Sequence, residues 1–135
     1  MKCPCYSGKP YAECCQPFHT GGKLPENAEQ LMRSRYSAYS LNLADYIIET
    51  THPENPAYQK NKAGWKTSIE EQYKTVSFDR LEINEFSENE SEAFVSFNAH
   101  LSKNGIDISF SEKSRFLKIE NRWLYHSGVV HSLTR

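Results

Sequence analysis

Residues 93–110 read AFVSFNAHLSKNGIDISF, and the spacing of the apolar residues in this stretch decides the fold class. Apolar side chains occupy every second position of its first half, which is the period of a β-strand with one buried face. They are Ala93, Val95, Phe97, Ala99 and Leu101. Asn104-Gly105 is the residue pair that two-residue hairpin turns favour. The chain is therefore expected to turn there and to return as a second antiparallel strand.

The neighbouring segments extend this hairpin into a sheet. Alternation places six residues on one face of the returning strand: Ile106, Ile108, Phe110, Glu112, Ser114 and Phe116. An earlier strand carries Val76, Phe78, Leu81 and Ile83, and the offset between Phe78 and Leu81 predicts a β-bulge. Asn121-Arg122 predicts a turn into a final strand over residues 123–130. The second half of the chain is thus expected to form a four-stranded antiparallel meander.

The segment before the first strand has a helical period instead. Asn27 opens a capping box and predicts the start of a first helix. Asn42 predicts the N-cap of a second helix, which ends at Pro53. A third helical stretch is expected over residues 56–73, interrupted by Gly64. Helices followed by an antiparallel sheet form an α+β pattern in which the helices cover one sheet face.

The chain has four cysteines, all within the first fifteen residues. They are Cys3, Cys5, Cys14 and Cys15. Four thiolates in a closed tetrahedral arrangement are a common structural zinc site, so the pattern favours zinc. Two disulfides or free thiols are the alternative, although pairing neighbouring cysteines would close very small, strained rings. His19 lies just beyond Cys15 and is expected to support the site rather than to bind the metal.

The segment around the cysteines is expected to be a small unit of its own. It has almost no apolar core, so metal binding must supply its folding free energy, on the order of 10 kcal/mol. Residues 18–25 include Gly21, Gly22 and Pro25, and they predict a linker to the main domain. No signal peptide is recognisable, which indicates the reducing cytoplasm, where structural disulfides are rare.

Composition narrows the function classes. A chain of 135 residues suits one compact domain plus the small cysteine unit. The formal net charge is −1, so the basic surface that nucleic-acid binding needs is absent from the sequence. No apolar run reaches the roughly 18 residues of a membrane span. Aromatic residues make up 13% of the chain, which predicts either a densely packed core or an aromatic-lined cavity.

Several motifs resemble known proteins. The run from Cys3 to Cys15, CPCYSGKPYAECC, resembles the SEC-C motif, the zinc knuckle at the carboxyl end of the translocase ATPase SecA. The segments LMRSRYSAY (residues 31–39), THP (51–53) and RW (122–123) match the pattern of the YchJ family of small bacterial proteins. The chain is identified as a member of that family on these motifs, which together span nearly its whole length.

The resemblance implies a fold but no activity. It implies a SEC-C zinc knuckle over residues 1–20, followed by a nuclear-transport-factor-2-like (NTF2-like) domain over residues 25–135. Such a domain is a cone, in which three helices pack on a curved, mainly antiparallel sheet of about four strands. This agrees with the α+β pattern of the apolar residues.

The interior of the cone is the expected pocket. Its candidate residues are Arg35, Tyr36, Tyr39, Tyr46, His52, Trp65, Glu112, Ser114, Tyr125 and His126. Glu112 shares its strand face with phenylalanines, and burying its carboxylate without a partner would cost too much. We therefore expect a structural salt bridge or hydrogen-bond network there, with a general base as the alternative. For His52, beside Pro53, a helix-capping role is favoured over catalysis.

Two function classes are consistent with the sequence. The first is a zinc-binding adaptor whose knuckle docks on a protein, with translocation or the ribosome suggested by analogy with SecA. Its cone would bind a hydrophobic small ligand or form a homodimer. The second, weaker alternative is a small dehydratase, isomerase or hydrolase that uses the pocket, which rests on fold analogy alone. No catalytic residue is assigned, and four cysteine ligands leave no open metal position for water.

Overall fold

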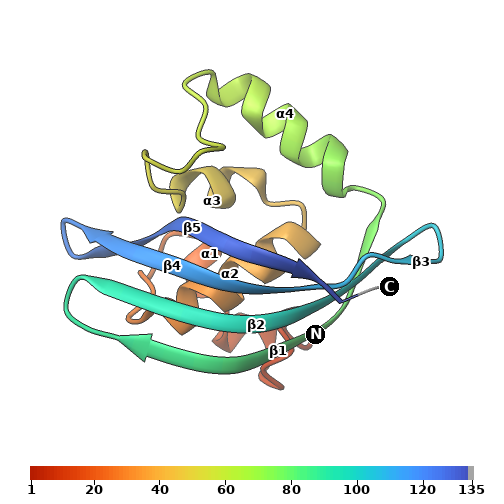
Figure 1. Ribbon diagram of the computed structural model, residues 1–135, viewed down its shortest axis with the longest axis horizontal. Coiled ribbons are helices and arrows are strands. Elements are labelled where there is room, and N and C mark those ends of the chain that lie inside the picture. Colours follow the sequence, from red (N-terminus) through yellow and green to blue (C-terminus); the bar gives the residue numbers. More distant parts are fainter. Residues whose placement is uncertain (134–135) are drawn as a thin grey trace.

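A computed structural model describes residues 1–133, and its second half is an antiparallel sheet (Figure 1). The strands are β1 (Val76–Glu88), β2 (Glu92–Lys103), β3 (Ile106–Asp107), β4 (Phe110–Ile119) and β5 (Arg122–Ser132). They lie in the order β1-β2-β4-β5, with the short β3 paired to β2. The expected meander is confirmed. Residues 134–135 of the expected 25–135 domain lie outside the described part.

The alternation read from residues 93–101 is confirmed in β2. The five apolar residues predicted to face inward in this strand are all buried, and the residues between them are half-buried on the other face. The inward face packs with Phe116 of β4, Trp123 of β5 and Leu31 of the longest helix in the main hydrophobic core. Burial of one sheet face against helices is what the period-2 pattern requires.

The return from the hairpin differs from the single strand that the sequence predicts. Asn104 and Gly105 have φ values of 53° and 78°, as a tight two-residue turn requires. The strand is then broken between β3 and β4. The hydroxyl of Ser109 accepts a hydrogen bond from the backbone N–H of Leu101 at 3.1 Å, so a side chain replaces a ladder bond. Ile106 and Ile108, expected on the same strand face as Phe110, are both exposed.

Irregular pairing bends the sheet. The expected bulge is confirmed as a register shift between Phe78 and Arg80, and a second shift lies between Ile83 and Glu85. The turn before β5 is formed by Glu120 and Asn121, both at positive φ, and Arg122 already belongs to the strand. The predicted turn is therefore placed one residue too late. Bulges increase strand twist and bend, which curves the sheet around the helices.

The helices gather on one side of this curved sheet (Figure 1). They are α1 (Gln16–His19), α2 (Ala28–Ser40), α3 (Ala44–Glu49) and α4 (Lys62–Tyr73), preceded by a 3-10 turn at Tyr11–Glu13. α2 contacts β1, β2 and β5, whereas α4 contacts α3 and leads directly into β1, where Tyr73 lies 6.3 Å from Phe78 between ring centres. Within the described residues, none of the helices combines the length and apolar character needed to cross a membrane.

Two asparagines predicted as helix N-caps lie at the two ends of α2. The Asn27 side chain accepts a hydrogen bond from the Gln30 backbone N–H at 2.8 Å, so the expected N-cap is confirmed. Asn42 does not cap α3, whose N-cap is Leu43. It lies just after α2 instead, in the left-handed conformation with a φ of 60° that commonly ends a helix. The backbone N–H of Leu43 donates to the carbonyl of Ala38 at 2.8 Å, which is the pattern of a Schellman motif.

We expect Asn27→Ala to lower the free energy of unfolding by about 1 kcal/mol, because it removes the side-chain acceptor at the start of α2. Urea denaturation followed by circular dichroism will measure the change. Asn84→Ala is the control, since its amide contacts Asn98 on the exposed sheet face. A loss for Asn27→Ala no larger than for the control would contradict the assigned cap.

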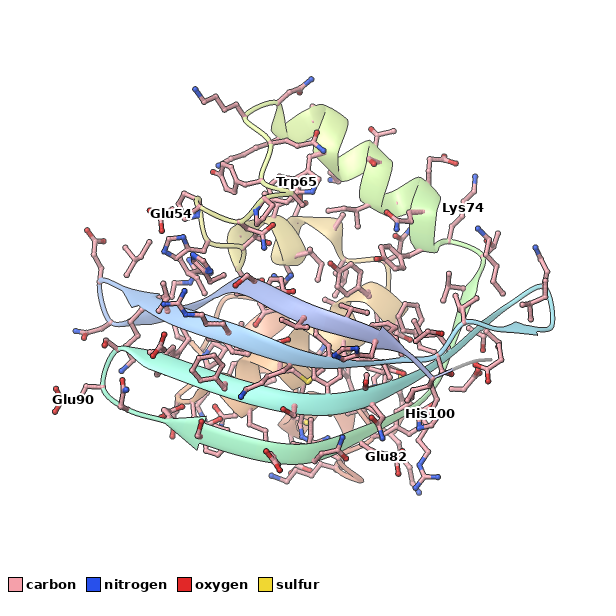
Figure 2. The ribbon with its side chains drawn as sticks, viewed as in Figure 1. Glu54, Trp65, Lys74, Glu82, Glu90 and His100 are labelled. Atoms are coloured by element: carbon pink, nitrogen blue, oxygen red, sulfur yellow. The ribbon has the colours of Figure 1, made fainter. Side chains whose placement is uncertain are left out.

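The remaining helices begin and end at positions other than those predicted. α3 ends at Glu49, before Pro53, because the following residues pair with β5. α4 begins at Lys62 and not near residue 56. Gly64 lies in its first turn, where its N–H donates to the Asn61 side chain at 3.1 Å. Trp65, labelled in Figure 2, is buried from α4 in a second apolar cluster with α3.

Candidate metal centre and ligand cavity

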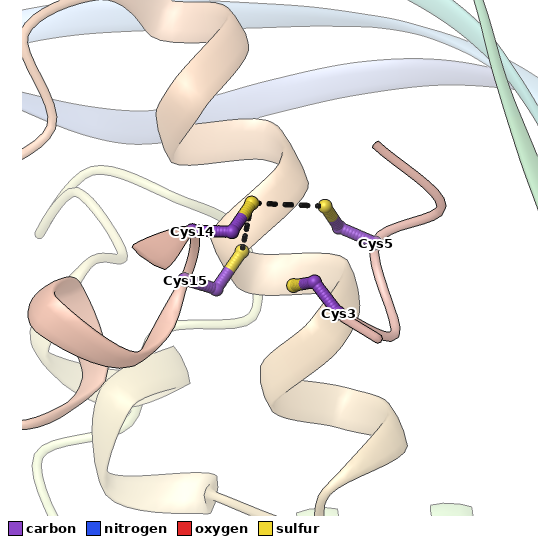
Figure 3. Close-up of side chains that lie close together, drawn as sticks. All are labelled: Cys3, Cys5, Cys14 and Cys15. Atoms are coloured by element: carbon purple, nitrogen blue, oxygen red, sulfur yellow. Dashed lines mark hydrogen bonds between the residues drawn. The ribbon is translucent and has the colours of Figure 1, made fainter. Parts of the chain in front are cut away.

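The four cysteine sulfurs converge in the first fifteen residues (Figure 3). All four Sγ atoms lie within 4.8 Å of one another. The Sγ of Cys14 lies 3.6 Å from that of Cys5 and 3.9 Å from that of Cys15. None of the four cysteines forms a disulfide, and three of them are buried.

These separations fit a tetrahedral metal site. Four sulfurs held about 2.3 Å from one zinc ion would be separated by edges of about 3.8 Å. The observed separations of 3.6 and 3.9 Å lie on either side of that edge. A disulfide would require a sulfur separation of about 2.05 Å. The arrangement therefore matches the metal alternative and not the disulfide alternative.

Local backbone geometry brings the sulfurs together. Lys2 pairs with Pro10 in an antiparallel bridge, and the N–H of Cys3 donates to the carbonyl of Lys9 at 2.9 Å. Tyr6 and Gly8 adopt positive φ values of 62° and 86°, which reverses the chain between the two cysteine pairs. A non-glycine residue rarely adopts this conformation, so Tyr6 is held there by the surrounding contacts.

The metal-free thiols are unequal in acidity. Burial raises the pKa of Cys3 to about 11. A hydrogen bond from the Cys15 thiol lowers the pKa of Cys5 to about 4, and the same bond raises the pKa of Cys15. Without a cation, the buried group thus holds thiols as well as thiolate. A bound divalent ion would stabilise the thiolates, so metal binding should release protons.

The knuckle packs tightly on α2. Arg33 donates from Nη1 to the carbonyl of Cys5 at 3.0 Å. Tyr6 donates from its hydroxyl to the carbonyl of Phe78 in β1 at 2.7 Å. Phe18, expected in a linker, belongs to α1 and is buried against Ala38 and neighbouring residues of α3 and α4. The linker is therefore shorter than residues 18–25, because α1 is part of the packed structure.

His19 connects the knuckle to α2. Its Nε2 lies 2.8 Å from the carbonyl of Ser34, which can only accept, so Nε2 carries the proton and donates. Nδ1 of the neutral ring then accepts from the Tyr11 hydroxyl at 2.7 Å. Burial lowers the pKa of His19 and favours this neutral form. Both ring nitrogens are engaged, so His19 supports the knuckle from outside the sulfur group.

A cavity of about 250 Å³ lies inside the cone, between α2 and the sheet. Six of the expected pocket residues line it: Arg35, Tyr36, Tyr39, Glu112, Ser114 and Tyr125. A second cavity, of about 270 Å³, lies toward α3 and α4 and includes the expected Trp65. The two cavities share four residues: Arg35, Tyr39, Tyr73 and Tyr125. These four side chains form the wall between them.

Arg35 is buried in that wall by a specific set of contacts. Its Nη1 donates to the carbonyl of Ile47 at 3.0 Å and to the hydroxyl of Thr50 at 2.7 Å. It also donates to the hydroxyl of Thr51 at 3.2 Å. The guanidinium carbon lies 4.7 Å from the centre of the Tyr125 ring, in a cation–π arrangement. Arg35 thereby joins α2 to the end of α3 and to β5.

Glu112 has partners of a different kind from those expected. Its Oε2 accepts hydrogen bonds from the hydroxyls of Ser114 and Tyr125, the latter at 2.9 Å. No ion pair joins Glu112 to Arg35 or to another cation within residues 1–133. The hydrogen-bond network is present, and the salt bridge is not. Burial, and the adjacent Glu112 carboxylate, raise the pKa of the Tyr125 hydroxyl.

Three expected pocket residues lie elsewhere. Tyr46 donates to the Ser34 hydroxyl at 2.6 Å and packs against His19, behind the knuckle. His52 and His126 lie edge to face with ring centres 5.0 Å apart, near the exposed Glu54 labelled in Figure 2. His52 accepts the N–H of Glu54 at Nδ1, so it closes a turn after α3 and does not cap a helix.

Other lining residues were not expected from the sequence. They are Met32, Tyr73, Phe78, Phe97, Ala99, Leu101, Phe110 and Phe116. Most have the apolar spacing that also predicts an ordinary core, so the pattern alone does not distinguish a cavity wall from packed interior. The sequence did contain one indication for Tyr73 and Phe78. Tyr73 ends the third predicted helix and Phe78 lies near the start of the first predicted strand, so the two residues could have been expected to lie close together.

Comparisons with known proteins agree with this architecture. The family model for the middle NTF2-like domain of YchJ matches residues 27–128. The chain belongs to the YchJ family. It is 40% identical over 131 residues to a UPF0225 protein of Photorhabdus laumondii, covering 94% of this chain and 79% of that relative. A UPF0225 protein of Deinococcus radiodurans is 40% identical over 125 residues, covering 91% of this chain and 85% of the relative.

Solved structures confirm the fold of this YchJ-family chain. The solution structure of a SEC-C motif containing protein from Rhodopseudomonas palustris has a TM-score of 0.82 and 34% identity, covering 96% of this chain and 98% of that one. The crystal structure of a SEC-C motif containing protein from Psychrobacter arcticus has a TM-score of 0.76 and 28% identity, covering 98% of this chain and 84% of that one. The expected family and the α+β fold class are both confirmed.

Proposed function

We propose that this protein is a zinc-stabilised binding protein whose cone holds a small, mainly apolar organic molecule. The observation that carries the proposal is the cavity of about 250 Å³ lined by aromatic side chains together with Arg35 and Glu112. Protein interiors are normally packed to the density of organic crystals, and a void lined by large side chains forfeits contact energy. A concave apolar space with a few polar groups is the usual form of a ligand site.

Zinc is the metal that the four-cysteine site supports best. Thiolate ligands favour soft or borderline ions, and a closed set of four cysteines is typical of structural zinc. Cys3, Cys5, Cys14 and Cys15 would hold the ion, and its charge would stabilise their thiolates. With all four positions taken, the ion would organise the knuckle and leave the chemistry of the cavity to other residues.

The other expected roles stay predictions. An adaptor function of the knuckle and a protein partner on the ribosome or translocation machinery rest on the resemblance to the SEC-C motif. A homodimer formed by the cone rests on the family resemblance. The small-enzyme alternative rests on fold analogy, and the cytoplasmic location rests on the sequence.

Filling the cavity should weaken ligand binding without unfolding the protein. N-phenyl-1-naphthylamine, whose fluorescence rises in apolar surroundings, is the probe. Ala99 is buried in β2 and lines the cavity, so Ala99→Leu would extend a side chain into the space. We expect this substitution to weaken probe binding by about tenfold or more, equivalent to about 1.4 kcal/mol.

The control for this experiment is Ser96→Leu, on the outer face of the same strand. It should leave the fluorescence titration unchanged. Unfolding in urea must be recorded for both variants, so that a loss of binding is separated from a loss of structure. Absence of a fluorescence rise with the unaltered protein, or equal binding by Ala99→Leu, would refute the proposed function.

A further inference from the structure

We propose that Glu112 selects a ligand with a protonated amine, so that the cavity binds small aromatic ammonium compounds rather than anions. The inference rests on the proposed function and adds the charge and chemical class of the ligand. It depends on the hydrogen bonds of the carboxylate, on the glycine opposite it and on the aromatic walls around it.

The Glu112 carboxylate is only partly satisfied by the protein. Oε2 accepts both available hydrogen bonds, from the Ser114 and Tyr125 hydroxyls. Within residues 1–133, Oε1 accepts no hydrogen bond and the group has no ion-pair partner. Oε1 is therefore free to accept a hydrogen bond from a ligand, and a bond from an ammonium group would be charge-assisted. A ligand ammonium would also supply an ion-pair partner.

The position of the carboxylate is built into the sheet. Gly128 of β5 lies opposite Ser114 of β4 in the strand register. A Cβ atom at Gly128 would collide with Oε2 of Glu112, and would lie 2.6 Å from its Cδ and 2.8 Å from the Tyr125 hydroxyl oxygen. Only glycine leaves room for the carboxylate and the phenol together. Ser114, Tyr125 and Gly128 therefore hold Glu112 in one place at the cavity.

The cations near Glu112 within residues 1–133 are used elsewhere. Arg35 directs Nη1 to three oxygens of α3 and the residues after it, and its guanidinium lies against the Tyr125 ring. Lys113 follows Glu112 but points to the opposite sheet face, where its Nζ lies 5.0 Å from the centre of the Phe94 ring. Among the described residues, none takes the free acceptor at Glu112, and a ligand group could occupy it.

The cavity walls favour the same ligand class. Tyr39, Tyr73, Phe97 and Phe110 are among the rings that line it. Aromatic faces attract ammonium groups, and the attraction is stronger when the cation is desolvated. A carboxylate ligand would instead meet the negative charge of Glu112. Aromatic rings on the walls and one carboxylate at the polar end suit a flat ring joined to a short aminoalkyl group.

The proposal can be tested with two matched probes. Benzylamine is protonated at neutral pH, whereas benzyl alcohol has nearly the same shape and no charge. Each would be titrated against protein loaded with N-phenyl-1-naphthylamine. We expect benzylamine to displace the naphthylamine at a concentration about tenfold lower than benzyl alcohol does, the ratio given by one charge-assisted hydrogen bond.

Glu112→Gln keeps the shape of the side chain and an oxygen that can still accept from Ser114 and Tyr125. We expect Glu112→Gln to weaken the binding of benzylamine by about tenfold. The affinities for benzyl alcohol and for the naphthylamine should change by less than about twofold. Glu85→Gln, an exposed change on β1, is the control and should alter none of the three. Equal binding of benzylamine to wild type and Glu112→Gln, with naphthylamine binding intact, overturns the proposal alone. Failure of the naphthylamine to bind wild type overturns the proposed function with it.

Gly128→Ala is a second test that leaves Glu112 in the chain. The new methyl group should push the carboxylate from its site, since the colliding atom is the end of a flexible side chain. We expect the binding of benzylamine to weaken by about tenfold, while the affinity for the naphthylamine stays within about twofold of that of the unaltered protein. Gly22→Ala is the control, because a Cβ there would meet no atom closer than 3.8 Å. Unchanged benzylamine binding by Gly128→Ala would overturn the assigned position.

Discussion

Cys14→Ser is expected to abolish metal binding and to unfold residues 1–20 while the cone stays folded. Serine is a poor zinc ligand, and the metal supplies on the order of 10 kcal/mol of folding free energy to a knuckle of this kind. The cone should nevertheless lose stability, because Phe18 and His19 pack on it and Arg33 donates to Cys5. We estimate that loss at roughly 3 kcal/mol, the cost of exposing one buried aromatic side chain and its neighbouring hydrogen bonds.

Elemental analysis and urea denaturation together test this prediction. The unaltered protein should contain one zinc ion per chain, and Cys14→Ser none. Glu13→Ser changes an exposed neighbour in the same turn and serves as the control. Loss of the near-ultraviolet circular dichroism signal of Cys14→Ser without denaturant would contradict the expectation that the cone folds without the knuckle. Retention of zinc by this variant would contradict the four-cysteine site.

The knuckle also supports the cavity wall. Tyr6 donates to the carbonyl of Phe78, and its ring lies edge-on to Tyr36 at 6.3 Å. Tyr36 and Phe78 both line the first cavity. Binding of N-phenyl-1-naphthylamine should therefore weaken in Cys14→Ser, although none of the four cysteines lines either cavity. The same titration in Glu13→Ser should match the unaltered protein.

Arg35→Met is expected to lower the free energy of unfolding by about 3 kcal/mol. Methionine fills much of the same space but cannot donate. The carbonyl of Ile47 and the hydroxyls of Thr50 and Thr51 would then lose a charged donor inside the protein. The stacking of the guanidinium on Tyr125 would be lost as well. Because Arg35 joins α2, α3 and β5, its removal should loosen the wall between the two cavities.

Arg115→Met is the matched control. Arg115 pairs with Glu92 at 2.7 Å, but the pair is partly exposed, and such pairs contribute about 1 kcal/mol or less. Urea denaturation of both variants gives the comparison. If Arg35→Met lowers the urea midpoint no more than Arg115→Met does, the buried contacts of Arg35 do not stabilise the cone.

Local signals in the sequence were sufficient for most of the fold. The period-2 spacing in β2 and the Asn104-Gly105 turn depend on strand pleating and on backbone conformations available to few residues. The Asn27 cap depends on one side chain and a backbone group three positions later. Asn42 was misassigned because asparagine suits both an N-cap and the left-handed end of a helix. Only the contacts of Leu43 and Ala38 distinguish the two.

Of the two candidate sites, the cysteine cluster could be predicted from the sequence, whereas the contacts inside the cavity could not. The spacing of the four cysteines by itself predicted a cysteine cluster suited to a metal ion, because thiolates that close together in sequence can reach one ion, whereas disulfides between neighbouring cysteines would be strained. The partners of Glu112 and Arg35 could not be read from the sequence. They come from segments far apart in the chain, and the register of β4 with β5 and the packing of α2 on α3 decide which atoms meet. The tertiary structure therefore decided that the carboxylate has hydroxyl partners instead of an arginine, and that the cone keeps an open interior.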